Sequence, residues 1–157
     1  MKAGVFLLAC LALCVAVKAQ DVPQNVLSFT RPAKIQLKAG ASATVTLPLT
    51  VAAGYHVNSN EPKDQFLIPI RLTWTAAALQ AGEVKYPRAE IRKLGFSEKP
   101  VSIFSGTFEL TTKFEVPADA PPGAGTIGGK LHFQACNDRM CLAPKTIAVE
   151  LPYEVVK

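Results

Sequence analysis

Cys136 and Cys141, near the C-terminal end of the chain, are the residues whose type and spacing can do chemistry. Four residues separate them, and this intervening run, Asn-Asp-Arg-Met, is typical of a turn. A chain that reverses over so short a span can bring two Cα atoms to the ~4.4–6.8 Å separation that disulfides usually span. We therefore expect a disulfide between Cys136 and Cys141 to be geometrically easy.

Such a disulfide is either a structural cross-link or a redox pair. Closing so small a loop removes only roughly 2 kcal/mol of chain entropy from the unfolded state, so a cross-link between distant strands would stabilise more. A redox pair would alternate between dithiol and disulfide, with a reactivity set by the thiolate and its accessibility. The residues alone leave both interpretations open, and the non-enzymatic alternative is a binding module with a structural hairpin disulfide.

A third interpretation of the same region is a metal site. His132, Cys136, Met140 and Cys141 include soft donors that suit copper(I). A blue-copper site would also need a ligating histidine between the cysteine and the methionine, and that interval holds none. We therefore expect no metal, with His132 as a strand residue facing the surface and Met140 as an apolar shield beside the cysteines.

Alternating apolar and polar residues dominate the rest of the chain and predict strands with one buried face. The alternation is clearest over residues 44–51, 68–74, 108–116, 127–136 and 147–155. In the fourth run Cys136 shares its parity with the polar residues, which predicts that it leaves the strand on the less buried side. Turn residues between the runs predict about eight to ten strands in an all-β, two-sheet β-sandwich.

Some segments depart from this pattern. A helical turn is expected only at residues 76–80, and irregular loops at residues 58–67 and 87–100. Prolines 48, 69 and 152 lie within predicted strands, and since proline cannot donate to a ladder these strands should be edges or carry bulges there.

The first nineteen residues resemble an export signal. Lys2 precedes an almost wholly apolar stretch, and Ala19 follows as a small residue at a cleavage position. We expect cleavage after Ala19, a periplasmic location and no stable membrane insertion of the mature protein. A retained membrane anchor or a lipid anchor at Cys10 are the alternatives, although the apolar stretch is short for a bilayer span of about 20 residues.

Composition limits the remaining possibilities. The chain has 157 residues, 49% of them hydrophobic, and a formal net charge of +5 that falls to +3 without residues 1–19. This length and apolar content predict one folded domain over residues 20–157. Because no Lys/Arg cluster with interleaved aromatic residues occurs, we expect no nucleic-acid partner.

The cysteine segment resembles a known family, the N-terminal periplasmic domain of the thiol:disulfide interchange protein DsbD. Residues 133–144 follow that family's active-site pattern: an aromatic residue, Gln, Ala and Cys, then a short polar turn, a second Cys and a nearby proline. Residues 55–67, 85–87 and 94–100 are similar to other family segments in the same order. The family's best-known members have one more residue between the cysteines.

The resemblance implies an immunoglobulin-like fold that relays reducing equivalents to oxidised periplasmic proteins, including haem-assembly thioredoxins of cytochrome c biogenesis. Cys141 would form the mixed disulfide with the partner and Cys136 would resolve it. Phe66 matches the aromatic residue of the cap loop that covers the pair, and Asp64 the acidic residue just before it. No cofactor is implied, and the expected partners are thioredoxin-like domains and a membrane electron donor on a separate chain.

Overall fold

The computed structural model describes residues 25–75 and 78–157, which contain twelve strands and no helix. The strands are β1 (Leu27–Phe29), β2 (Ile35–Lys38), β3 (Ser42–Val51), β4 (His56–Asn58), β5 (Arg71–Trp74), β6 (Gln80–Lys85), β7 (Glu90–Arg92), β8 (Val101–Phe104), β9 (Thr107–Glu115), β10 (Gly123–Phe133), β11 (Ala135–Cys136) and β12 (Lys145–Val156). The predicted export signal, residues 1–19, lies outside the described residues.

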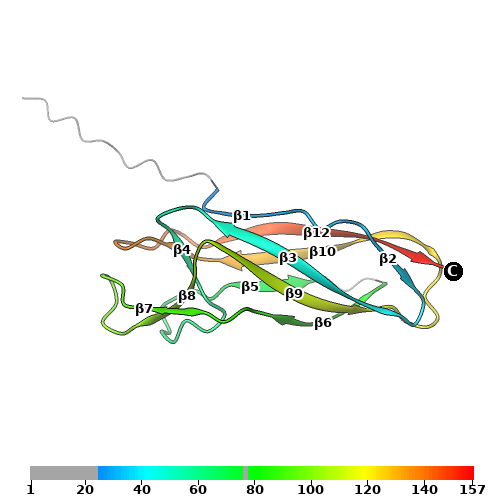
Figure 1. The fold of residues 1–157 in the computed structure, drawn as a ribbon, viewed down its shortest axis with the longest axis horizontal. Coiled ribbons are helices and arrows are strands. Elements are labelled where there is room, and N and C mark those ends of the chain that lie inside the picture. Colours follow the sequence, from blue (N-terminus) through cyan, green and yellow to red (C-terminus); the bar gives the residue numbers. More distant parts are fainter. Residues whose placement is uncertain (1–24, 76–77) are drawn as a thin grey trace, which may run out of the picture.

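Two four-stranded sheets form a sandwich along the length of the molecule (Figure 1). The first has the order β1-β3-β9-β6, and the second has the order β2-β12-β10-β5. Their long inner strands alternate buried and exposed residues, because one face of each sheet is covered by the other. Leu47 and Leu110 of the first sheet and Leu131 and Val149 of the second belong to one buried cluster, which is the core between the sheets.

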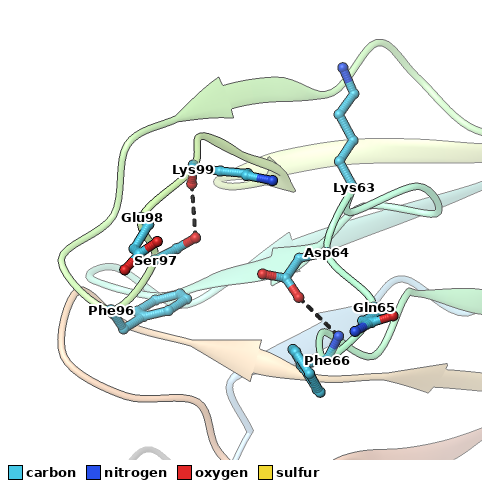
Figure 2. Close-up of a pocket in the computed structure, with 8 residues that line it drawn as sticks. All are labelled: Lys63, Asp64, Gln65, Phe66, Phe96, Ser97, Glu98 and Lys99. Carbon is cyan, nitrogen blue, oxygen red and sulfur yellow. Dashed lines mark hydrogen bonds between the residues drawn. The ribbon is translucent and has the colours of Figure 1, made fainter.

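A third sheet, with the order β11-β4-β8-β7, extends the sandwich at the end opposite the C-terminus (Figure 1). Its strands are two to four residues long. The loop between β4 and β5 and the loop between β7 and β8 line a common cleft (Figure 2). This end of the molecule therefore combines short strands and long loops, the arrangement in which functional residues are usually carried on a rigid scaffold.

The all-β sandwich predicted from the alternating pattern is confirmed. The long strands β3, β9 and β12 coincide closely with three of the predicted runs, whereas the strand expected from residue 68 begins at Arg71. Of the expected helical turn, residues 76–77 lie outside the described residues. Residues 78–79 form a bend, and β6 begins at Gln80. The third sheet was not predicted.

Pro48 and Pro152 lie inside strands of the two large sheets, so the prediction of edge strands is wrong for β3 and β12. Both strands have neighbours on two sides. Pro152 precedes the point where β2 begins to pair with β12 at Tyr153, and Pro48 adjoins the end of the short β1 ladder at Leu49. The missing N–H of Pro152 therefore falls before the β2 ladder begins, whereas at Pro48 the pairing continues through the Thr30 N–H, which donates to the Pro48 carbonyl at 3.1 Å. Pro69 lies outside β5.

Trp74 connects the two large sheets and makes one glycine of β10 sensitive to substitution. Its indole Nε1 donates a hydrogen bond to Thr112 Oγ1 at 3.0 Å, and its ring packs edge-to-face on Phe114 at 5.2 Å. A Cβ added at Gly129 would lie 2.8 Å from the indole, whereas one at Gly128 would meet nothing closer than 3.6 Å.

We expect Gly129→Ala to lower the free energy of unfolding by about 1–3 kcal/mol, because the indole must move from its packed position. Chemical denaturation monitored by tryptophan fluorescence measures this change. The adjacent Gly128→Ala variant is the matched control and should stay within about 0.5 kcal/mol of the wild type. Equal effects of the two substitutions would contradict this assignment of the contact.

Candidate redox site

Cys136 and Cys141 form a disulfide with their Cα atoms 3.9 Å apart. The turn between them is built by Asn137, whose Oδ1 accepts hydrogen bonds from the backbone N–H groups of Arg139 and Met140, both at 2.9 Å. The Asn137 N–H in turn donates to the Met140 carbonyl at 2.9 Å. An asparagine side chain that replaces a backbone partner is a common way to stabilise a tight turn, so the predicted turn and disulfide are both present.

The two cysteines differ in exposure. Cys136 is completely buried, whereas Cys141 is partly exposed. The prediction that Cys136 leaves its strand on the less buried side is wrong. Because β10 ends at Phe133, the alternation does not continue through Gln134, and β11 joins the third sheet opposite β4. A disulfide of this kind offers one accessible residue and one shielded residue to an incoming thiolate.

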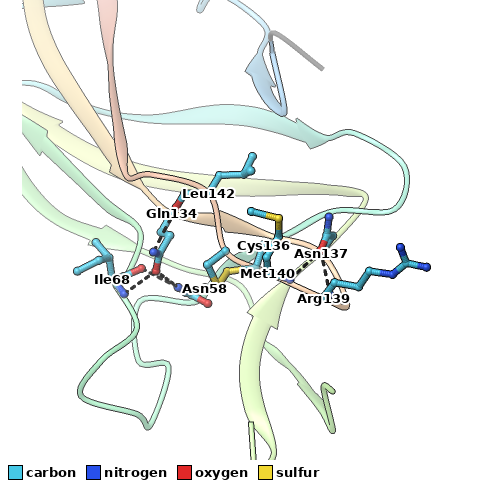
Figure 3. Close-up of a disulfide and its surroundings, with 9 residues drawn as sticks. Asn58, Ile68, Gln134, Cys136, Asn137, Arg139, Met140 and Leu142 are labelled. Atoms are coloured by element: carbon cyan, nitrogen blue, oxygen red, sulfur yellow. Dashed lines mark hydrogen bonds between the residues drawn. A yellow bond between two sulfur atoms is a disulfide. The ribbon is translucent and has the colours of Figure 1, made fainter. Parts of the chain in front are cut away.

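Gln134, immediately before β11, joins the segments that surround the disulfide (Figure 3). Its Oε1 accepts hydrogen bonds from Asn58 Nδ2 and the Ile68 N–H, both at 3.1 Å. Its Nε2 donates to the carbonyl of Leu142, the residue after Cys141, at 3.3 Å. One amide therefore fixes β4, the loop between β4 and β5 and the segment that follows Cys141 relative to one another. The resemblance to the family included this glutamine in the active-site pattern, but the sequence did not indicate its hydrogen-bond partners.

His56 of β4 lies directly opposite Cys136 in the β4–β11 pairing. It is 2% exposed, its ring stacks on that of Phe96 with 6.2 Å between centroids, and its Nε2 is buried without a hydrogen-bond partner among the described residues. Burial lowers the pKa of His56, the nearby Arg92 lowers it further, and Asp138 and Glu90 oppose the change. Sequence reasoning did not find this residue, because nothing local relates position 56 to position 136.

This lowered pKa makes stability depend on pH. Below about pH 6.5 the unfolded chain binds a proton at this histidine more readily than the folded chain does, so acid favours unfolding. We expect the stability contribution to be present above that pH and to be lost, by at most about 1.4 kcal/mol per pH unit, as the pH falls toward the folded pKa. Denaturant titrations between about pH 7.5 and about pH 5 measure it.

The difference in free energy of unfolding between the two pH limits should be smaller in His56→Gln, because this substitution removes the titrating group. The variant His132→Gln controls for loss of a histidine as such. A His56→Gln variant with the full wild-type pH dependence would contradict the assignment.

The predicted cap-loop residues lie on a tight turn in the loop between β4 and β5. Asp64 Oδ1 accepts a hydrogen bond from the Phe66 N–H at 2.9 Å, and Lys63 before it has a left-handed φ of 65°. Phe66 is 81% exposed, so neighbouring residues cover little of its surface. A cleft of about 550 Å³ has Phe66 on one loop and Phe96 on the other (Figure 2).

The residues considered for a metal lie as follows. His132 is on β10, where its Nδ1 is 2.8 Å from Thr146 Oγ1, and Met140 exposes 54% of its surface to solvent, so it is not a buried shield. Across residues 25–75 and 78–157, no group of three or more His, Cys, Asp or Glu side chains is arranged to hold a metal ion.

Similarity to known proteins identifies the class of the domain. The sequence profile of the family described as "Thiol:disulfide interchange protein DsbD, N-terminal" matches residues 23–152. The chain belongs to this family. No curated protein matches the chain. The expected immunoglobulin-like fold is confirmed by this membership and by the sandwich described above.

Two solved structures of such domains are similar. The N-terminal periplasmic domain of ScsB from Proteus mirabilis has a TM-score of 0.56 at 10% identity, over 80% of this chain and 44% of that chain. This protein thus spans less than half the length of that chain. The Neisseria meningitidis DsbD N-terminal domain in the reduced form has a TM-score of 0.49 at 16% identity, over 75% of this chain and 86% of that chain.

One further finding concerns membranes. Nothing helical in the described part of the chain has the length and apolar character needed to cross a bilayer.

Proposed function

We propose that this protein is a periplasmic thiol:disulfide interchange domain over residues 20–157, exported by cleavage after Ala19. It would take reducing equivalents from a thioredoxin-like donor, itself supplied by a membrane electron donor, and pass them to oxidised periplasmic proteins. The observation that carries this proposal is the unequal exposure of a closely spaced disulfide, in which Cys141 is partly accessible and Cys136 is buried. A purely structural cross-link has no need of a partly exposed cysteine.

The chemistry consists of two thiol–disulfide exchanges. A donor thiolate attacks Cys141 Sγ, the Cys136–Cys141 bond breaks, and Cys136 leaves as a thiolate that takes up a proton. The second donor thiol then attacks the mixed disulfide, so the donor is oxidised by two electrons and the domain becomes a dithiol. Cys141 next attacks the disulfide of a target protein, and Cys136 attacks Cys141 to release the reduced target and restore the original bond.

A relay experiment tests this proposal. Domain reduced by a thioredoxin and separated from it should transfer two electrons to an oxidised thioredoxin-like acceptor, such as one that serves haem assembly. Alkylation of free thiols followed by mass measurement should show one acceptor disulfide opened for each Cys136–Cys141 bond formed. A domain that stays reduced while the acceptor stays oxidised would contradict the proposal.

We also propose that the loop carrying Asp64 and Phe66 gates access to the pair. An aromatic ring that is 81% exposed on a turn entered through a left-handed lysine is a candidate for movement between solvent and a contact. The Asp64 hydrogen bond to the Phe66 N–H would hold the turn while the ring moves.

If Phe66 closes over the reduced pair, Phe66→Ala should raise the rate at which a small disulfide oxidises the dithiol by about tenfold, equivalent to about 1.4 kcal/mol of lost shielding. Stopped-flow oxidation by hydroxyethyl disulfide measures this rate. The substitution Ile91→Ala is the control, because Ile91 is also an exposed apolar residue but lies on β7. Identical rates for wild type and Phe66→Ala would show that the ring does not act as a gate.

A further inference from the structure

His56 and the two cysteines lie in one row across the third sheet. His56 is the cross-strand partner of Cys136, and Cys136 forms an isolated antiparallel bridge with Cys141. Residues directly opposite one another in an antiparallel pair project to the same face, with Cβ atoms about 4.5–5.5 Å apart. The imidazole and the buried sulfur are therefore side-chain neighbours.

The imidazole also has an unused hydrogen-bonding group. Its Nε2 is buried and has no partner among the described residues, and a buried polar atom left unpaired destabilises the fold. Such an exception in a folded protein calls for an explanation, and a redox or catalytic use is one of the recognised ones. In the disulfide state Cys136 has no hydrogen to offer, whereas in the dithiol state its S–H can meet a ring nitrogen.

The surroundings suit proton transfer. His56 is one of the residues that line a cleft of about 480 Å³, together with Arg92 and Asp138, and it is also the cross-strand partner of the enclosed Cys136. The charged groups that act on it are Arg92, which opposes protonation, and Asp138 and Glu90, which favour it. Glu90 is itself paired with Arg92 at 3.3 Å. Burial and Arg92 prevail, so the pKa of His56 is lowered and the ring is neutral at neutral pH, able to accept a proton.

We propose that His56 is the proton relay of the buried cysteine. This inference rests on the proposed exchange function. When Cys136 attacks the mixed disulfide at Cys141, its thiol proton passes to His56, the Cys136–Cys141 bond forms and the target thiolate leaves. The imidazolium then releases the proton through the cleft. In the opposite direction His56 takes up a proton from solvent and passes it to Cys136 as that sulfur leaves, which avoids an enclosed thiolate with its desolvation cost.

A chromogenic disulfide, dithiobis(nitrobenzoate), separates the two steps. Cys141 of the reduced domain attacks the probe and releases one coloured nitrothiobenzoate thiolate, in a phase whose rate increases with probe concentration. Cys136 then attacks the mixed disulfide and releases the second, in a phase whose rate is independent of probe concentration. Two thiols thereby lose two electrons to the probe and two protons to His56 and solvent.

We expect His56→Gln to leave the first phase within about twofold of the wild type and to slow the second roughly 100-fold near pH 7, at the lower end of what a positioned proton acceptor contributes. The wild-type second phase should be nearly independent of pH from about 6.5 to about 8, since a neutral base removes the proton. In His56→Gln it should rise about tenfold per pH unit, because it follows the thiolate fraction. His132→Gln, on β10, is the matched control and should behave as the wild type.

An unchanged second-phase rate and pH profile in His56→Gln would overturn the inference. Should that variant not fold, the wild-type profile alone decides, because a second phase that rises about tenfold per pH unit also overturns it. A wild-type domain that releases no second thiolate contradicts the exchange function itself. A wild type with a normal second phase, together with a His56→Gln variant whose second phase is unchanged, contradicts only the proton relay.

Discussion

Replacing Cys136 with alanine is expected to trap the domain in a stable mixed disulfide with a thioredoxin-like protein that keeps one active-site cysteine, supplied as its mixed disulfide with nitrothiobenzoate, approaching one partner per domain. Cys141 is partly exposed and can still attack and displace nitrothiobenzoate, but neither the variant nor the partner has a second sulfur to break the new bond. Cys141→Ala should trap none, since the remaining sulfur is completely buried. Non-reducing electrophoresis followed by mass measurement of the linked peptides reports both results.

The pair of variants is its own control, because each retains one thiol and lacks the native disulfide. Any general effect of losing the bond is common to both. Trapping through Cys136 in the Cys141→Ala variant, with none in Cys136→Ala, would reverse the proposed order of attack and resolution.

Gln134→Ala should be among the most destabilising single substitutions near the site. It removes the acceptor for Asn58 Nδ2 and for the Ile68 N–H, and the donor to the Leu142 carbonyl. Asn58 Nδ2 keeps its hydrogen bond to the Ile68 carbonyl at 3.0 Å, whereas the Ile68 N–H and the Leu142 carbonyl lose their partner. An unpaired polar group costs about 1–3 kcal/mol, so we expect a loss of about 2–4 kcal/mol and a Tm lower by roughly 10 °C. Thermal unfolding followed by circular dichroism measures it.

Gln80→Ala provides the comparison, because this glutamine is exposed at the start of β6. It should change the free energy of unfolding by no more than about 0.5 kcal/mol. A Gln134→Ala variant that unfolds at the same temperature as Gln80→Ala would show that the Gln134 hydrogen bonds do not hold the site together.

Local features of the sequence were sufficient to predict the sandwich and the disulfide. Long strands such as β3, β9 and β12 alternate over nine or more residues, and a pattern of that length is difficult to mistake. The disulfide was predictable because only four residues separate Cys136 from Cys141. Both depend on neighbours along the chain.

The third sheet and the surroundings of the disulfide could not be predicted in the same way. Its four strands have two to four residues each, too few to show a period, and β4 is buried at all three positions. The burial of Cys136 follows from the break at Gln134, and the contact of His56 with Phe96 joins residues forty positions apart. Such features arise from tertiary packing, which a single sequence does not display.

A redox titration of the mature domain tests the central claim most directly. The domain is equilibrated in thioredoxin or glutathione buffers of graded potential, its free thiols are alkylated, and the mass reports the fraction of Cys136–Cys141 that is open. We predict a reversible two-electron transition that changes tenfold per about 30 mV and has its midpoint between about −180 and −300 mV, with the reduced domain still folded. A bond that stays closed in the most reducing buffer, or a domain that unfolds when the bond opens, would contradict the account.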